Sequence, residues 1–414
     1  MEKPSMVDPW FQSLFADRMG GVNYGKDNKI YKFEKIKRAK RAALADHPER
    51  RLLDFGIGEN DERADELVRE ALKREVDKLE NRGYADNGIA AFKEAAAGFM
   101  KKIFAVSLDP ATEVNHAIGS KPAFAMLPAV FINPGDVTLM TVPGYPVAGT
   151  HTSYYGGEVY KLPLREENGF LPDLASIPAA IRKRAKLLVI NYPNSPTGAV
   201  ATRDFYRQVI DFAHSNKVIV VQDAAHISLT YDGPPLSFLQ VEGAKEVGVE
   251  VHSLSKGFNM IGWRMGFVAG HAKIVQAFAD VKDNCDSGQF MAIQQAAKVA
   301  LDHPEIAERT REKYRRRLGK LVAALGQVGF RAKMPSGTYF LYVKAPRGCL
   351  GQDFANAEEA SQFLIRDQSL CCVPWDDAGA YLRFSVTYLA TDVSEEDILM
   401  AETVSRLKRL GLRF

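Results

Sequence analysis

Between Val114 and Gly270 the chain alternates short apolar runs with longer amphipathic ones, and this alternation constrains the fold more than any other feature. Several runs are continuously apolar, as expected of strands buried on both faces of a sheet. Strands that alternate with amphipathic helices indicate the α/β class, with helices covering a mostly parallel central sheet. The expected strands are Val114–Ile118, Val137–Val142, Leu187–Ile190, Val218–Val221, Val249–His252 and Phe267–Ala269.

The C-terminal part of the chain has a different pattern. A long polar helix is expected from Glu305 to Val328. Beyond it, segments such as Tyr339–Val343 and Tyr381–Val386 alternate apolar and polar residues. This pattern is typical of a smaller α+β unit.

A chain of 414 residues is long enough for two domains. We expect an N-terminal arm and part of a small domain in residues 1–50, a large domain in 51–300, and a small C-terminal domain in 301–414. Residues 28–46, rich in Lys, Arg and Ala, are expected to be helical. The charge run Lys35–Arg41 is interpreted as the solvated face of that helix.

Composition excludes several classes of protein. The chain is 46% hydrophobic and 25% charged, as in ordinary globular proteins, and its net charge of +3 is too small to indicate a nucleic-acid partner. No apolar run could span a membrane, and Met1–Gly21 lacks the apolar core of a signal peptide. The four cysteines lack metal-ligand spacing, and the adjacent Cys371 and Cys372 would bridge poorly. We therefore expect reduced thiols, no metal and a cytoplasmic location.

A lysine follows one of the expected strands. Ser253-Leu254-Ser255-Lys256 comes directly after Val249–His252, and Arg264 lies eight positions further on. Open α/β sheets bind ligands at the carboxyl edge of their strands, where the Lys256 amine would lie. The hydroxyls before Lys256 and the guanidinium after it form a cradle for a dianion. An amine beside a phosphate cradle is what pyridoxal 5'-phosphate requires, although most lysines are only solvated surface groups.

Two further motifs follow expected strands. The loop Asn191-Tyr192-Pro193-Asn194-Ser195-Pro196-Thr197-Gly198 is made rigid by its prolines, and Asn194 could donate to a phenolate-like oxygen or a carboxylate. The same loop could equally be a turn that only closes a strand–helix connection. The buried strand Val218–Gln222 runs into Asp223, which would be costly to bury without a partner. A protonated pyridine nitrogen would supply that partner; the alternative is a helix N-cap.

Three other candidates have two interpretations each. Gly119-Ser120-Lys121-Pro122 begins a helix and could expose backbone N–H groups to a phosphate, although such turns also occur without a ligand. Tyr145 could stack on a pyridine ring or pack at the rim. Arg383 interrupts an apolar strand pattern, so it lies either on the solvent face or in a bidentate carboxylate clamp.

Together these residues resemble the fold-type I pyridoxal-phosphate enzymes, specifically the class I/II aminotransferases, from Leu52–Gly58 to Arg383. The resemblance implies that Lys256 binds the cofactor covalently and then moves a proton between the substrate's Cα and the cofactor's C4′. It implies that Asp223 pairs with the ring nitrogen, Asn194 meets the ring oxygen and Tyr145 stacks on the ring. The phosphate ligands that it implies are Ser120, Lys121, Ser253 and Arg264.

The same resemblance implies the substrate contacts and the assembly. Arg383 would clamp the α-carboxylate of the substrate, with Gly58 and Asn194 beside it. Tyr84, in the segment Gly83–Gly88, matches a tyrosine that in this family reaches the phosphate of the neighbouring subunit. A homodimer with shared active sites follows from that match.

One residue departs from the family pattern. Aminotransferases usually have tyrosine where this chain has His226, and that tyrosine hydrogen-bonds the phenolic oxygen of the cofactor. Some related acyl-transferring pyridoxal enzymes carry histidine there. Because imidazole titrates near neutrality, we expect a pH optimum different from the family norm. The alternative is a packed histidine that faces away from the ring.

Within the class, three segments are similar to those of a bacterial branch of LL-diaminopimelate aminotransferases: Tyr31–Arg41, Gly83–Gly88 and Val373–Gly379. This similarity implies transfer of an amino group between glutamate/2-oxoglutarate and the lysine precursor tetrahydrodipicolinate. A plant-like branch reads the far end of the substrate with a glutamate in its Gly-Tyr loop. Here the loop is shorter and carries Asp86 and Asn87, so those contacts are not transferable residue by residue.

Three alternatives stay open from the sequence. The first is an aminotransferase for aspartate, alanine or aromatic amino acids. The second is a pyridoxal-phosphate enzyme that breaks another bond, such as a carbon–sulfur lyase or an acyl-transferring synthase. The presence of His226 is compatible with this alternative. The third is a pyridoxal-binding regulator, disfavoured because no helix-turn-helix is evident before residue 28.

Overall fold

A seven-stranded sheet forms the centre of the structure, a computed structural model that describes residues 9–26 and 32–414. Within this sheet only β8 runs against its neighbours, and the other adjacent strands are parallel. The mostly parallel α/β sheet and its six expected strands are confirmed; β4, an edge strand with an exposed pattern, was not expected. The spatial order is β2 (Val114–Ala117), β8 (Gly266–Gly270), β7 (Gly248–Ser253), β6 (Ile219–Asp223), β5 (Ala185–Asn191), β3 (Val137–Val142) and β4 (Glu158–Pro163).

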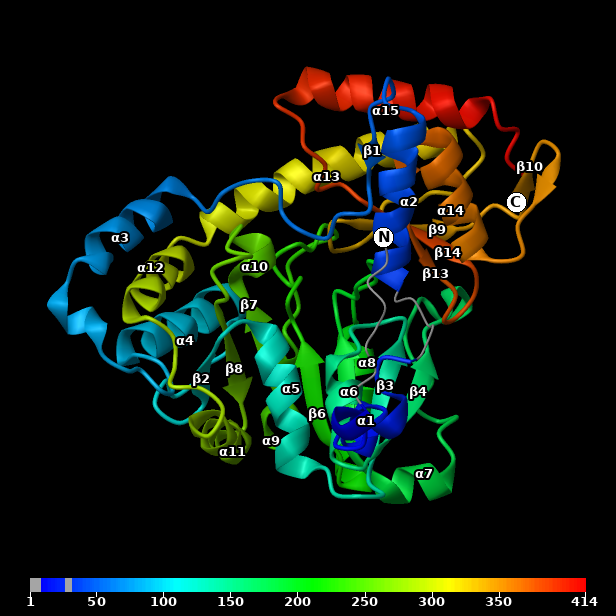
Figure 1. Cartoon of the computed structure of the whole chain (residues 1–414). Helices are drawn as coiled ribbons and strands as arrows, with labels where there is room; N and C mark the ends of the chain where they lie inside the picture. Colours follow the sequence, from blue (N-terminus) through cyan, green and yellow to red (C-terminus); the bar gives the residue numbers. More distant parts are fainter. Residues whose placement is uncertain (1–8, 27–31) are drawn as a thin grey trace.

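Helices cover both faces of this sheet (Figure 1). Successive strand residues point to opposite faces, so Leu187 and Val189 enter one core cluster while Leu188 and Ile190 enter the other. The first face is covered by α5 (Ser120–Phe131), α6 (Val147–Tyr154) and α11 (Ala272–Asp283). The second is covered by α3 (Glu66–Val76), α4 (Ala90–Phe104), α8 (Arg203–Asn216), α9 (Ala244–Val247) and α12 (Met291–Asp302). Burial on both faces explains the continuously apolar runs.

A second, smaller core lies around a three-stranded antiparallel sheet of β13 (Val373–Trp375), β14 (Tyr381–Ser385) and β9 (Phe340–Lys344). Both ends of the chain contribute to it, because β1 (Leu53–Asp54) pairs with β12 (Leu370–Cys371). Figure 1 shows α13, in yellow, leading from the large sheet's helices to this unit. Its helices are α2 (Lys32–Asp46), α13 (Glu305–Gly326), α14 (Ala357–Gln368) and α15 (Val393–Lys408). The remaining short elements are α1 (Pro9–Gln12), α7 (Ala179–Arg184), α10 (Leu254–Gly257), β10 (Gly348–Cys349) and β11 (Gln352–Asp353).

The helix expected over residues 28–46 is observed from Lys32 onward, and residues 28–31 lie outside the described part. Its charge run is not wholly solvated, because Lys35 pairs with Glu358 and Lys40 with Asp54. These pairs fix α2 to the small unit, a contact that helical periodicity alone does not reveal. The domain boundaries expected at residues 50 and 300 stay predictions. In residues 9–26 and 32–414 no helix has the length and apolarity needed to cross a bilayer.

Candidate active site

The carboxyl ends of the central strands bring the candidate residues to one edge of the sheet. Asn191, Asp223 and Val251 are neighbours across β5, β6 and β7. Asn194 follows β5, Asp223 ends β6 and Lys256 follows β7 within α10. Because β8 is antiparallel, its first residue lies opposite the ends of β2 and β7, which brings Arg264 to the same edge. This is the edge at which open α/β sheets bind ligands.

The Lys256 amine points toward the segment that carries Gly58. Its Nζ donates to the Gly58 carbonyl at 3.0 Å, and the Tyr339 hydroxyl donates to the same oxygen at 2.7 Å. Burial lowers the pKa of Lys256 to about 8; the Glu59 charge opposes this shift, whereas the Arg264 and Arg383 charges add to it. A lysine with a lowered pKa is a better nucleophile and base near neutral pH.

We predict that Lys256 of the unloaded protein reacts with an amine-directed reagent along a titration curve centred near pH 8. The neutral amine is the reactive form, so the labelling rate should rise with pH and level off above this midpoint. Peptide mass spectrometry would follow the rate at Lys256, with Lys256→Met as the blank. A midpoint near the ordinary lysine value of about 10.4 would show that the side chain is solvated.

Asp223 is a buried carboxylate that forms no ion pair with any residue in the described part of the chain. Its Oδ1 accepts a hydrogen bond from the Ala225 backbone N–H at 3.0 Å. Burial raises the pKa of Asp223 to about 6, although that hydrogen bond and the charges of His252 and Lys256 oppose the rise. A cationic ring nitrogen beside Asp223 would offset the desolvation, so the chemistry of this site fits a pyridinium. No helix follows Asp223 directly, which removes the N-cap alternative.

Two buried side chains present nitrogens without partners in the described chain. The Asn194 Oδ1 accepts hydrogen bonds from the Thr197 hydroxyl at 2.8 Å and from the Thr197 backbone N–H at 3.2 Å. The Asn194 Nδ2 is left unpaired. His226 packs edge-on against the Tyr339 ring, at 5.3 Å between centroids, and its Nδ1 is likewise unpaired. Such atoms are costly unless a ligand satisfies them. Asn194 therefore both closes its turn and offers a donor.

An altered pH optimum stays a prediction, but the surroundings of His226 do not favour its titration near neutrality. Burial, with the positive charges of Lys256 and Arg383, holds the pKa of His226 well below its ordinary value. The imidazole is therefore neutral over the physiological range and can donate from one nitrogen only. Any unusual pH optimum would have to arise from other groups.

A dianion cradle lies where β2 ends and β8 begins. A Cβ on Gly119, which has φ +75°, would lie 2.3 Å from the Arg264 Nη2, so glycine lets the guanidinium contact this turn. The Arg264 Nη1 donates to the Ser255 hydroxyl at 3.4 Å, and the Ser253 hydroxyl accepts from the Ser255 N–H at 3.2 Å. With Ser120 at the first position of α5, hydroxyls, a helix N-terminus and a guanidinium converge.

Three predicted cofactor ligands lie at the surface. Tyr145 is 42% exposed and lines a small cavity with Asp223 and Asn191, where it could cover a ring. Lys121 is exposed and forms no hydrogen bond or ion pair with the rest of the described chain, so its phosphate contact stays a prediction. Tyr84 is 82% exposed, and its segment is held by the Lys282 amine on the Asp86 carbonyl. An exposed ring on an anchored segment suits a contact outside its own subunit.

Arg383 is buried on β14, which removes the solvent-face alternative. Its Nη2 donates to the Gly56 carbonyl at 3.0 Å, its guanidinium lies 4.1 Å from the Phe340 ring centroid, and its Nε has no partner within the described residues. Burial lowers the pKa of Arg383 to about 10, so the group stays charged at neutral pH. A Cβ on Gly58 would lie 4.0 Å from the Arg383 Nη2, which places these two predicted substrate contacts together.

Of three further residues that shape this site, the sequence indicated only Ser255, as one of the hydroxyls before Lys256. Ser255 contacts Arg264, Tyr339 shares the Gly58 carbonyl with Lys256, and Phe340 lies under Arg383. The two aromatic residues lie in an alternating strand, where nothing local distinguishes them from core residues.

Comparison with known proteins gives the family. Residues 50–398 match the model of aminotransferase class I and II. The chain belongs to this family. It is 56% identical to the LL-diaminopimelate aminotransferase of Methanocaldococcus jannaschii, covering 99% of this chain and 100% of that protein, and 55% identical, with the same coverage, to that of Methanococcus maripaludis.

Solved structures agree with this family. Substrate-bound BacF from Bacillus subtilis superposes with a TM-score of 0.84 at 32% identity, covering 93% of this chain and 97% of BacF. A probable N-succinyldiaminopimelate aminotransferase from Thermus thermophilus gives a TM-score of 0.82 at 26% identity, covering 92% of this chain and 100% of that one. The chain is thus a fold-type I aminotransferase, and the expected enzyme class is confirmed.

Proposed function

We propose that this aminotransferase uses pyridoxal 5'-phosphate on Lys256 to exchange the amino group of LL-diaminopimelate with 2-oxoglutarate. The observation that carries the proposal is the joint placement of Lys256 and Arg383 on the carbonyls of Gly58 and Gly56. Both side chains are thereby held against one short segment, so that an amine and a carboxylate-binding cation lie close together. An α-amino acid needs both groups, because its amino and carboxylate groups are on the same carbon. The choice of diaminopimelate is supported by the names of relatives that match nearly the whole chain.

The cofactor fits the donors that are present. Asp223 would hold a ring nitrogen in its cationic form, Asn194 and His226 would face the ring oxygen, and Tyr145 would cover the ring. The Gly119–Ser120 turn with Ser253, Ser255 and Arg264 would hold the phosphate. When bound, pyridoxal phosphate supplies the electron sink that delocalises the negative charge left at the substrate's Cα.

The residues of the chain supply positioning and proton transfer. Arg383 binds the α-carboxylate and, with Gly58, orients the Cα–H bond toward Lys256. Once the amine of the substrate has displaced it from the cofactor, the Lys256 amine would be free and, neutral above about pH 8, could take the Cα proton and give it back on the cofactor side. Holding these groups in place lowers the barrier through orientation and fixed charge.

We also propose a homodimer in which Tyr84 reaches the phosphate site of the partner subunit. Its 82% exposure on an anchored segment supports this assignment. Tyr84→Phe should raise the concentration of cofactor needed for half-saturation by about 10–150-fold, since one hydrogen bond to a charged group is worth about 1.5–3 kcal/mol. Equilibrium dialysis measures the change, and unaltered cofactor affinity in dimeric Tyr84→Phe would contradict the assignment.

The substrate assignment is tested with a panel of amino donors and 2-oxoglutarate. We expect LL-diaminopimelate to turn over with a higher kcat/KM than aspartate, alanine or aromatic amino acids. Turnover of aspartate with diaminopimelate inert would overturn the narrow assignment. Formation of pyruvate and ammonia from cystathionine without a keto acid would instead indicate a lyase.

Arg383→Lys is predicted to lower kcat/KM for the amino acid by about 10²–10³-fold, because the forked guanidinium pair with carboxylate is lost. Arg383→Met should cost at least as much. The comparison donor is a primary amine without a carboxylate, whose slow reaction should not change. Equal losses for both donors would mean that Arg383 supports the fold rather than binding carboxylate.

A further inference from the structure

The chain segment 56–61 contacts both functional groups and is called here the bridging segment. Its Gly56 carbonyl accepts from Arg383 and its Gly58 carbonyl from Lys256, each at 3.0 Å. Its Asn60 Nδ2 donates to the Lys256 carbonyl at 2.8 Å. The distance between the amine and the guanidinium therefore depends on how firmly this segment is held.

Asp61 anchors the end of the bridging segment on α13. Its carboxylate accepts from the Lys313 amine at 2.6 Å, the Tyr314 hydroxyl at 3.1 Å and the Arg317 Nη1 at 3.0 Å. The side chains of Asp61 and Arg317 are 3% and 2% exposed. A buried carboxylate with three donors from one helix has little freedom to move.

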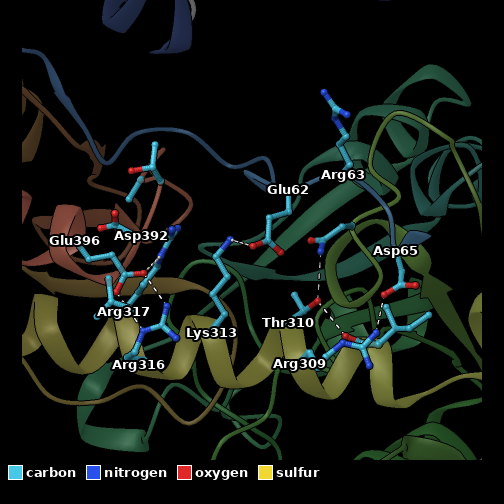
Figure 2. A pocket seen from close by; sticks show the side chains of 15 residues that line it. Glu62, Arg63, Asp65, Arg309, Thr310, Lys313, Arg316, Arg317, Asp392 and Glu396 are labelled. Carbon is cyan, nitrogen blue, oxygen red and sulfur yellow. Dashed lines mark hydrogen bonds and ion pairs between the residues drawn. The ribbon is translucent and has the colours of Figure 1, made fainter. Parts of the chain in front are cut away.

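Arg317 also holds the chain that leaves the Arg383 strand. Its Nη1 donates to the carbonyls of Val386 and Tyr388 at 3.0 and 2.9 Å, and its Nε donates to Glu396 of α15 at 2.7 Å. Figure 2 shows Arg317 and Glu396 beside Lys313 and Glu62 along α13, where they line a cavity of about 420 Å³. One guanidinium thus connects the segment under Lys256 with the end of the strand that bears Arg383.

We infer that the buried pair Asp61–Arg317 is a positioning device that sets the geometry of Lys256 relative to Arg383. The inference depends on the proposed function, in which one substrate must meet both groups. Within residues 9–26 and 32–414, neither Asp61 nor Arg317 forms a hydrogen bond or ion pair with Lys256 or Arg383. Both residues would act indirectly, by holding the backbone whose Gly58 and Gly56 carbonyls accept hydrogen bonds from Lys256 and Arg383. Such control matters because displacement of a reacting group by about 1 Å can lower the rate about 10²-fold.

Arg316 provides a matched control on the same helix. It pairs with the same Glu396 at 2.8 Å, but its side chain is 44% exposed and it makes no hydrogen bond to the bridging segment. Arg316→Gln leaves Glu396 paired with Arg317 and Lys320. Arg316→Gln therefore removes an arginine–Glu396 contact without touching the bridging segment, whereas a positioning role belongs to Arg317 alone.

The test compares Asp61→Asn, Arg317→Lys and Arg316→Gln with the parent protein. In the unloaded protein, the pH midpoint of Lys256 labelling should rise by about half a unit or more for the first two variants, because a loosened segment readmits water to the amine. Arg316→Gln should keep the parent midpoint. Thermal melting identifies the temperature at which every variant is folded, and Tyr314→Phe, which removes one donor to Asp61, replaces any variant that does not fold.

Activity of the loaded enzyme gives the second readout. Asp61→Asn and Arg317→Lys should lose about 10–100-fold in kcat for the amino acid and little for an amine without a carboxylate, because only the former uses both groups. Unchanged labelling midpoints and unchanged donor selectivity in folded variants would overturn the inference. If the parent protein does not accept diaminopimelate, the proposed substrate fails, and the labelling midpoints still decide the positioning role.

Discussion

Replacing Lys256 with methionine is expected to reduce kcat for transamination by at least about 10⁴-fold, because the variant loses both the covalent anchor and the proton carrier. The structure supports an effect of this size, since the Lys256 Nζ lies at the sheet edge with its pKa lowered to about 8. Single-turnover measurements with the amino donor would report the loss of the chemical step directly.

Lys256→Arg is the control for charge. It keeps a cation at this position, but a guanidinium is not a nucleophile and does not lose its proton near neutral pH, so it cannot replace the amine. The loss should therefore equal that of methionine. A methionine variant with more than a tenth of the parent's single-turnover rate would assign the proton transfer to another group.

The second large effect is expected at Asp223. Asp223→Asn keeps the shape of the side chain but removes the anion that would hold the ring nitrogen protonated, and kcat should fall by about 10²–10³-fold. Asp223→Glu keeps the charge and displaces it, so it should retain more activity than asparagine. Equal activity of the asparagine variant and the parent would mean that the ring nitrogen has no anionic partner here.

The same substitution should have the opposite effect on stability in the unloaded protein. The folded-state pKa of Asp223 is raised to about 6, so its ionisation opposes folding as the pH increases through the interval between its unfolded and folded values. Asparagine removes this penalty, which corresponds to about 2–3 kcal/mol above pH 6. Urea unfolding should show Asp223→Asn to be more stable than the parent by about 2–3 kcal/mol at pH 8 and by only about 1 kcal/mol at pH 4.5.

Local patterns predicted the scaffold well. The apolar runs located the central strands, because a strand buried on both faces must be apolar along its length. Polar residues that follow those runs lie at the carboxyl edge of the sheet, outside the core. Asn194, Asp223 and Lys256 were predicted as site residues from this position. β7 departs from the apolar pattern, because it buries Glu250 and His252 against each other, and β2 also departs from it, because it buries Asn115 and His116.

The connections between distant segments could not be predicted in this way. Gly58 and Lys256 are 198 positions apart, and nothing in either segment specifies their hydrogen bond. The helix expected at Glu305–Val328 was correctly placed, but its arginines are equivalent in the sequence. Only the tertiary structure separates Arg317, which is buried against Asp61, from the exposed Arg316.

The central claim is that the amine at position 256 carries the cofactor. The direct measurement is borohydride reduction of protein saturated with pyridoxal phosphate, followed by peptide mass spectrometry. We expect the peptide containing Lys256 to gain the mass of a phosphopyridoxyl group, with Lys121 and the other lysines unmodified. An unmodified Lys256 in fully loaded protein would contradict the account.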